Sequence, residues 1–283
     1  MEGEKIVKHN ENSRVKIPAL LHFKRLGYDY ISKVGAKIDS RNNIFIDIFE
    51  ENIKRINNKD YDRNKIMDLI KEVADLTDNR KDKGKSFYER LIDFNNIKLI
   101  DLENPLNNDF RVVTELTFKG ERHEFRPDIT ILINGIPLGF IEVKKPNNQN
   151  GGIQAEFKRM SERVAFSDCT HFFNQFQVLG FSNNQKYNDE DQIKVQGSFY
   201  TTPNGLSTRY NHFREEEEIH VNEYLDSDFI DSVLRDNNII SIKTTAEFER
   251  NLRVDTPCNS FITSVFSKER LIFFIRYGIV YVD

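Results

Sequence analysis

Three charged side chains flank two neighbouring apolar segments in the middle of the chain. Asp128 opens the first segment, and Glu142 and Lys144 close the second, on either side of Val143. Two carboxylates beside a lysine are typical of sites that bind Mg²⁺ and hydrolyse phosphate esters, because hard cations prefer oxygen ligands. The backbone carbonyl of Val143 is a further oxygen donor of this kind. The pattern therefore indicates a metal-dependent hydrolytic site.

Lys144 has three chemical roles open to it in such a site. It can position the attacking water, remove its proton if its own pKa is lowered, or neutralise the charge that develops on the phosphate. The sequence does not distinguish these roles.

A tight turn between the two segments must bring these residues together. Asn134 and Gly135 both tolerate positive φ, so the pair predicts a two-residue β-hairpin. Asp128 lies six residues before this turn and Glu142 seven residues after it, so the two carboxylates come close across the pair. Side chains alternate across a strand, which places Glu142 and Lys144 on one face and Val143 on the other.

The ordinary interpretation of such residues is a solvated hairpin face, since an aspartate followed by Glu-x-Lys is frequent by chance. Three features favour a site. The turn has the right length, a basic helix follows, and Glu142 stands within the apolar run 139–143. An unpartnered carboxylate is costly in such a position.

The remaining pattern predicts the elements that position the site. Helices are expected at 20–26, 44–56, 66–76, 87–94, 153–164, 224–234, 245–252 and 268–277, with a further helix starting at 215–218. Strands are expected at 97–102, 110–118, 125–133, 138–143, 176–181, 193–201 and from 279. This order predicts a mixed α/β fold with a central mixed sheet flanked by helices. We expect a helical part over 1–84, a core over 85–205 and a helical extension over 206–283.

Composition narrows the classes of protein further. The 283 residues carry a net charge of −4, with 12% aromatic residues and two cysteines, which argues against disorder and excludes a disulfide scaffold. No apolar run reaches the roughly 20 residues of a membrane helix, and no signal peptide is evident, so a cytoplasmic protein without a membrane partner is expected. A free-standing DNA-binding domain would be basic, so any DNA contact must come from a local patch or from partner domains.

The chain resembles a known nuclease family in this central region. The segments Arg126-Pro127-Asp128, Asn134-Gly135-Ile136-Pro137-Leu138 and Glu142-Val143-Lys144-Lys145-Pro146 look like the motif of the PD-(D/E)xK superfamily. They are most similar to its form in the restriction (R) subunit of type I restriction enzymes. Segments 172–184 and 260–272 extend the likeness. The resemblance implies a restriction-endonuclease-like core that cleaves double-stranded DNA with Mg²⁺, or with Mn²⁺ as a substitute. It makes Asp128 and Glu142 metal ligands and Lys144 the catalytic lysine.

The resemblance also suggests accessory residues. The family often has a glutamine in the helix after the lysine, with a tyrosine four positions later. Here Gln154 is a candidate, but Lys158 stands in the position of the tyrosine. Arg159 and Arg163 either contact phosphates or form a solvated helix face. Glu89 is a candidate for the additional acid that some relatives use.

Whole R subunits of the family continue into motor domains that use ATP to translocate DNA, and they assemble with methyltransferase and specificity subunits. This sequence contains no G-x-x-x-x-G-K-[ST] loop, so ATP is expected only in a full-length subunit. Two other hypotheses stay open: a non-catalytic module of nuclease fold that docks DNA or subunits, and a repair or recombination nuclease of the same superfamily.

Overall fold

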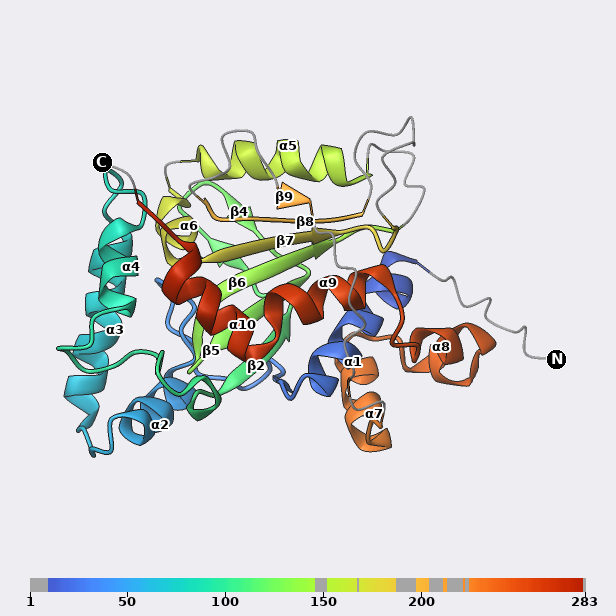
Figure 1. The fold of residues 1–283 in the computed structure, drawn as a ribbon, viewed down its shortest axis with the longest axis horizontal. Helices are drawn as coiled ribbons and strands as arrows, with labels where there is room; N and C mark the ends of the chain where they lie inside the picture. Colours follow the sequence, from blue (N-terminus) through green and yellow to red (C-terminus); the bar gives the residue numbers. More distant parts are fainter. Residues whose placement is uncertain are drawn as a thin grey trace.

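A seven-stranded mixed sheet forms the centre of the molecule (Figure 1). The computed structural model describes residues 10–145, 152–166, 168–186, 197–203, 211–212, 221 and 224–281. The strand order is β1-β2-β5-β6-β7-β8-β9, with parallel pairs β1–β2 and β6–β7 and antiparallel pairs elsewhere. The strands are β1 (Asp29–Tyr30), β2 (Phe110–Thr114), β5 (Ile129–Ile133), β6 (Ile136–Val143), β7 (Val178–Ser182), β8 (Ser198–Thr201) and β9 (Asn211–His212). A separate hairpin joins β3 (Phe118–Lys119) to β4 (Glu124–Phe125).

Helices cover both faces of this sheet, which confirms the predicted mixed α/β architecture. In Figure 1, α5 lies along one side of the sheet, and α9 and α10 cross the other. The α-helices are α1 (Ile17–Arg25), α2 (Ile46–Ile56), α3 (Arg63–Thr77), α4 (Lys85–Leu91), α5 (Gly152–Val164), α6 (Thr170–Gln175), α7 (Ser227–Asp236), α8 (Ala246–Asn251), α9 (Pro257–Phe266) and α10 (Lys268–Phe273). Shorter helical turns are η1 (Asn12–Lys16), η2 (Pro105–Asn107), η4 (Ile240–Thr244) and η5 (Phe274–Gly278). None of the described helices is long and apolar enough to cross a membrane.

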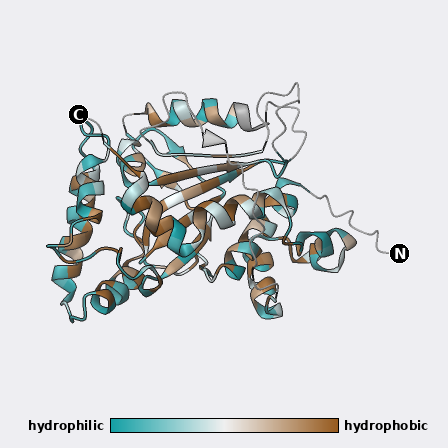
Figure 2. Cartoon of the chain, in the orientation of Figure 1, coloured by the Kyte–Doolittle hydropathy of each residue, from teal (hydrophilic) through white to brown (hydrophobic). Residues whose placement is uncertain are grey.

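Alternation of side chains along the strands produces two apolar cores. Ile129 and Ile131 of β5 belong to the larger core, which includes residues of α1, α2, α3, α9 and α10. Leu132 and Phe140 belong to the second core, which includes Phe157 of α5 and the phenylalanines of α6. Figure 2 shows the hydrophobic residues concentrated on the central strands. A sheet buried on both faces holds its strand ends in fixed positions.

The predicted Asn134-Gly135 turn is confirmed. Asn134 and Gly135 have φ values of 50° and 81°, and they connect the paired residues Ile133 and Ile136. The carbonyl of Gly135 accepts the N–H of Phe45 at 2.9 Å, and a Cβ atom on Gly135 would lie 2.8 Å from the carbonyl oxygen of Phe45. The turn therefore anchors the start of α2 as well as the hairpin.

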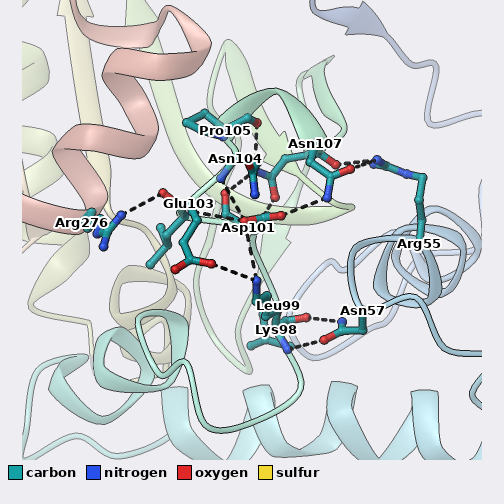
Figure 3. Close-up of polar contacts among 12 residues, drawn as sticks. Arg55, Asn57, Lys98, Leu99, Asp101, Glu103, Asn104, Pro105, Asn107 and Arg276 are labelled. Carbon is teal, nitrogen blue, oxygen red and sulfur yellow. Dashed lines mark hydrogen bonds and ion pairs between the residues drawn. The ribbon is translucent and has the colours of Figure 1, made fainter.

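The predicted strand at 97–102 is wrong, because this segment forms a loop held by Asp101 (Figure 3). The carboxylate of Asp101 accepts the N–H groups of Glu103 and Asn104 and the side-chain amide of Asn107. Leu99, Ile100 and Leu102 are still buried, and Ile97 is half-buried. The burial of these apolar residues gives the sequence a strand-like pattern. In the structure, hydrogen bonds from side chains to the backbone take the place of hydrogen bonds to a neighbouring strand.

Other boundaries also differ from the sequence pattern. The predicted strand 110–118 is split after Thr114, because Glu115 has a φ of 50° and turns the chain toward the β3–β4 hairpin. Helices α6 and α9 were not expected. Residues 279–281 are not a strand, and the acidic run 215–218 lies outside the described residues. The division at residues 84 and 205 stays a prediction.

A pair of glycine substitutions tests how tightly the hairpin turn packs. Gly135→Ala and Gly35→Ala place a side chain at similar φ values of 81° and 75°, so they carry similar backbone strain. Only Gly135→Ala also meets backbone atoms, since nothing lies within 4 Å of a Cβ on Gly35. We expect Gly135→Ala to lower the free energy of unfolding by about 1–3 kcal/mol more than Gly35→Ala, measured by urea unfolding. Equal losses would contradict the contact with α2.

Candidate active site

Asp128 and Glu142 face each other at one end of the β5–β6 hairpin. Asp128 directly precedes β5, and the last residue pair of the hairpin is Ile129 with Ile141. A register shift between Ile131 and Leu132 inserts one extra residue into β6. This β-bulge matches the unequal distances of the two acids from the turn, and it places Asp128 opposite Glu142. One carboxylate oxygen of Asp128 then accepts the N–H of Val143 at 2.9 Å.

Lys144 completes the group of three predicted residues. Its ammonium donates to the carbonyl oxygen of Val143 at 2.9 Å and lies 3.8 Å from Asp128 Oδ2 and 3.9 Å from Glu142 Oε2. Its backbone N–H donates to the carbonyl of Ser182 at 2.8 Å, which continues the pairing of β6 with β7. The structure thus brings Asp128, Glu142, Lys144 and the Val143 carbonyl together.

Two further carboxylates contact Lys144 that the sequence analysis missed. Glu11 Oε1 lies 3.4 Å from Lys144 Nζ, and Glu156 Oε2 lies 3.6 Å from it. The second oxygen of Glu11 accepts the N–H of Lys145. Glu156 had a signal in the sequence, because it stands seven residues before Arg163 on one face of the basic helix. Glu11 had none, since 133 residues separate it from Lys144.

The cations of α5 contact this group through Glu156. Arg159 Nη2 lies 2.6 Å from Glu156 Oε2, and its side chain is half exposed. Arg163 Nη1 lies 3.4 Å from Glu156 Oε1 and 3.7 Å from Glu142 Oε1, so it bridges two buried carboxylates. Both arginines therefore contact carboxylates of this group, and Lys158 is exposed beside them.

The two remaining accessory candidates are placed differently. Gln154 lies in α5, but its side chain is outside the described part of the structure. Glu89 is exposed on α4, which packs against α3 and α6. It is not among the carboxylates around Lys144, where Glu11 and Glu156 stand instead.

Burial and mutual repulsion shape the protonation of this site. Burial, together with the carboxylates of Asp128 and Glu156, raises the pKa of Glu142 well above its ordinary value. Burial alone would lower the pKa of Lys144, but the surrounding carboxylates outweigh it and hold that pKa above its ordinary value. Lys144 is therefore charged, and the carboxylates around it exceed the nearby cations in number.

The donor set fits a hard divalent cation. In the described residues, no three Asp, Glu, His or Cys side chains converge as metal ligands; the Lys144 ammonium lies among the carboxylates instead. Mg²⁺ commonly uses one or two carboxylates and keeps several waters. Asp128, Glu142 and the Val143 carbonyl supply oxygen ligands of this type, in a place that already attracts positive charge.

Comparison with known proteins identifies the family. The family model described as type I restriction enzyme R protein N terminus matches residues 8–219. The chain belongs to this family. The match spans β5, β6 and α5, and it includes Glu11 at its beginning.

Individual relatives agree with the family. A protein of Methanocaldococcus jannaschii named as the MjaIXP endonuclease subunit of a type I restriction enzyme is 28% identical over 210 residues, 64% of this chain and 20% of the relative. The EcoprrI endonuclease subunit of Escherichia coli, also of a type I restriction enzyme, is 30% identical over 115 residues, 41% of this chain and 29% of the relative. The matched part thus spans between a fifth and a third of these relatives.

The charge of Lys144 predicts a pH-dependent loss of stability in Lys144→Met. Without the ammonium, the pKa of Glu142 in the folded protein lies still further above its unfolded value of about 4. Groups with raised pKa values stabilise the fold below the unfolded pKa, and that stability is lost as the pH rises through the folded pKa. We therefore expect Lys144→Met to cost about 3–5 kcal/mol at pH 8 and clearly less at pH 5.

Urea unfolding in EDTA at the two pH values measures this effect. Lys145→Met is the matched control, because the neighbouring side chain is exposed, and it should change little at either pH. A loss for Lys144→Met that is equal at both pH values would contradict the carboxylate arrangement.

Proposed function

We propose that this chain is the nuclease part of a type I restriction R subunit and hydrolyses phosphodiester bonds of double-stranded DNA with Mg²⁺. The observation that carries the proposal is the meeting of Asp128, Glu142 and Lys144 at one end of the hairpin. Membership of the R protein family supports it. The proposal includes a PD-(D/E)xK core formed by β5, β6, β7 and α5.

Each residue then has a defined task. Asp128 and Glu142, with the carbonyl of Val143, would hold Mg²⁺, and Mn²⁺ would replace it. When bound, the metal acidifies a water and shields charge on the phosphate. The N–H of Val143 holds one carboxylate oxygen of Asp128 in place at this end of the hairpin.

The protonation of Lys144 bears on its three roles. Without metal, the surrounding carboxylates raise the pKa of Lys144, so it is protonated and cannot remove a proton from water. We assign Lys144 to hold its positive charge against the phosphate oxygens and to orient the nucleophilic water. Arg163 pairs with Glu142 and Glu156, and we assign the half-exposed Arg159, which pairs with Glu156, to contact the phosphate backbone of bound DNA.

The relatives are longer than this chain, and we assign the other activities of the system to the rest of a full-length subunit. ATP-driven translocation belongs there, since this sequence has no phosphate-binding G-x-x-x-x-G-K-[ST] loop. Methyltransferase and specificity subunits would be the partners, and the complex would act in the cytoplasm.

Substitutions that preserve shape test the metal site. We expect Asp128→Asn and Glu142→Gln to abolish Mn²⁺ binding, measured by titration calorimetry with a short duplex present. Nicking of supercoiled plasmid in Mg²⁺ should fall by at least about 100-fold in the same variants, and EDTA should abolish it in the wild type. Lys144→Arg keeps the charge but changes its geometry, so it should bind Mn²⁺ and still lose cleavage.

Glu162→Gln is the control, because Glu162 is exposed on the same helix and should behave as the wild type. Mn²⁺ binding that survives in both carboxylate variants would refute the assigned ligands. DNA binding without metal binding or cleavage would favour the docking module over the nuclease.

A further inference from the structure

A second polar feature adjoins the candidate active site. A cleft of about 500 Å³ lies between the N-terminal helical segment, the turn after β7 and the segment 247–257. Arg14, Arg250 and Arg253 line it, together with the acids Glu247 and Asp255. The catalytic residues discussed above do not line this cleft.

The cleft and the active site share two structural elements. Arg14 stands one helical turn after Glu11, which contacts Lys144. Asn184, on the cleft wall, lies two residues after Ser182, whose carbonyl accepts the N–H of Lys144. An extended ligand that leaves the active site in this direction therefore enters the cleft.

Hydrogen bonds between distant segments hold the cleft walls in place. The buried amide of Asn251 donates to the carbonyl of Ser13 at 2.6 Å, which ties α8 to η1. The carbonyl oxygen of the Asn184 side chain accepts the N–H of Cys258 at 3.0 Å, which ties the turn after β7 to the start of α9. These hydrogen bonds fix the backbone segments that carry the arginines.

The charges of the cleft are available to an anion. Arg14 pairs with Glu247 at 2.7 Å and Arg253 with Asp255 at 2.6 Å, but both arginines are more than half exposed. An exposed pair such as Arg253–Asp255 contributes at most about 1 kcal/mol, so a phosphate can displace Asp255. Glu247 is only 19% exposed, so its pair with Arg14 is the harder of the two to exchange. Arg250 is exposed on α8 and has no ion-pair partner among the described residues.

Two neighbouring features add positive potential. Lys186 is exposed two residues after Asn184 of the cleft wall. The pKa of Asp255 is lowered mainly by its hydrogen bond with Arg253, and the charge of Lys186 adds a smaller effect. The ten-residue helix α9 begins at the cleft, and the positive end of its dipole lies there. Its first N–H groups are occupied by Thr256 and Asn184, so it contributes through its field.

We propose that this cleft binds the sugar-phosphate backbone of the DNA strand next to the phosphate that is cleaved. The proposal rests on the proposed nuclease function. Arginine contacts to phosphates position a duplex but carry no sequence information, so the cleft binds DNA of any sequence. It supplies the local basic patch that an acidic chain needs in order to hold DNA.

The salt dependence of DNA binding tests the cleft directly. The intact chain is titrated onto a short fluorescein-labelled duplex in EDTA, so that no cleavage occurs, at several salt concentrations. Each lost phosphate contact lowers the slope of log K against log salt by about 0.9. We expect Arg250→Gln/Arg253→Gln to lower this slope by about 1.8 and to weaken binding on the order of tenfold per arginine at about 0.1 M salt.

Lys65→Gln/Lys71→Gln is the matched control, because it removes two exposed charges from α3 and should leave slope and affinity nearly unchanged. A cleft variant that behaves like this control overturns the proposal, as does a wild type that fails to bind DNA at low salt.

Cleavage separates this proposal from the nuclease assignment. Glu142→Gln should bind DNA with the wild-type slope and fail to cleave it. The cleft variant should cleave slowly at low DNA concentration and recover at saturating DNA. If Glu142→Gln cleaves DNA normally while the cleft variant loses DNA binding, the nuclease assignment is refuted and the DNA-binding role of the cleft is supported.

Discussion

The ammonium of Lys144 lies among carboxylates from four separate parts of the chain. Glu11 precedes η1, Asp128 precedes β5, Glu142 lies in β6 and Glu156 lies in α5. Buried charges are costly unless they are paired, so a displacement of any of these elements would break an ion pair of Lys144, and a displacement of α5 would also separate Arg163 from Glu142. This one charge therefore constrains how the N-terminal segment and α5 pack against the sheet, and it makes the site sensitive to every layer of the fold.

A β-bulge in β6 brings Asp128 and Glu142 into register beside Lys144. The turn at Asn134 and Gly135 alone would set the acids out of register by one residue, and the bulge in β6 removes the difference. It also leaves Glu142 on the face of Phe140, toward α5, and Val143 on the face toward α1 and α9. Glu142 lies close to Glu156 and Arg163 because its side chain is on the face of the sheet that α5 covers.

The sequence predicted the parts of the site that depend on local geometry. The hairpin, the approach of Asp128 to Glu142 and Lys144, and the helix that carries Arg159 and Arg163 follow from turn chemistry and periodicity. The bulge that places the two acids directly opposite each other was not predicted. Glu11 could not be predicted, because its place depends on how the N-terminal segment packs after folding. At the loop around Asp101 the sequence predicted a strand that does not form. Its buried apolar residues have the pattern of a strand, but the carboxylate of Asp101 accepts backbone N–H groups and holds the segment as a loop.

The proposed function requires an acidic chain to bind a polyanion. The carboxylates around Lys144 would repel DNA until cations reduce their charge, so attraction would have to come from elsewhere on the same surface. The cleft lined by Arg14, Arg250 and Arg253 lies one helical turn from Glu11 and next to the end of β7. This position suits the proposed binding of the DNA backbone that flanks the active site. Separating the two proposed functions in space would leave Asp128 and Glu142 available to a cation, while an arginine in an exposed ion pair, such as Arg253, could exchange its carboxylate for a phosphate.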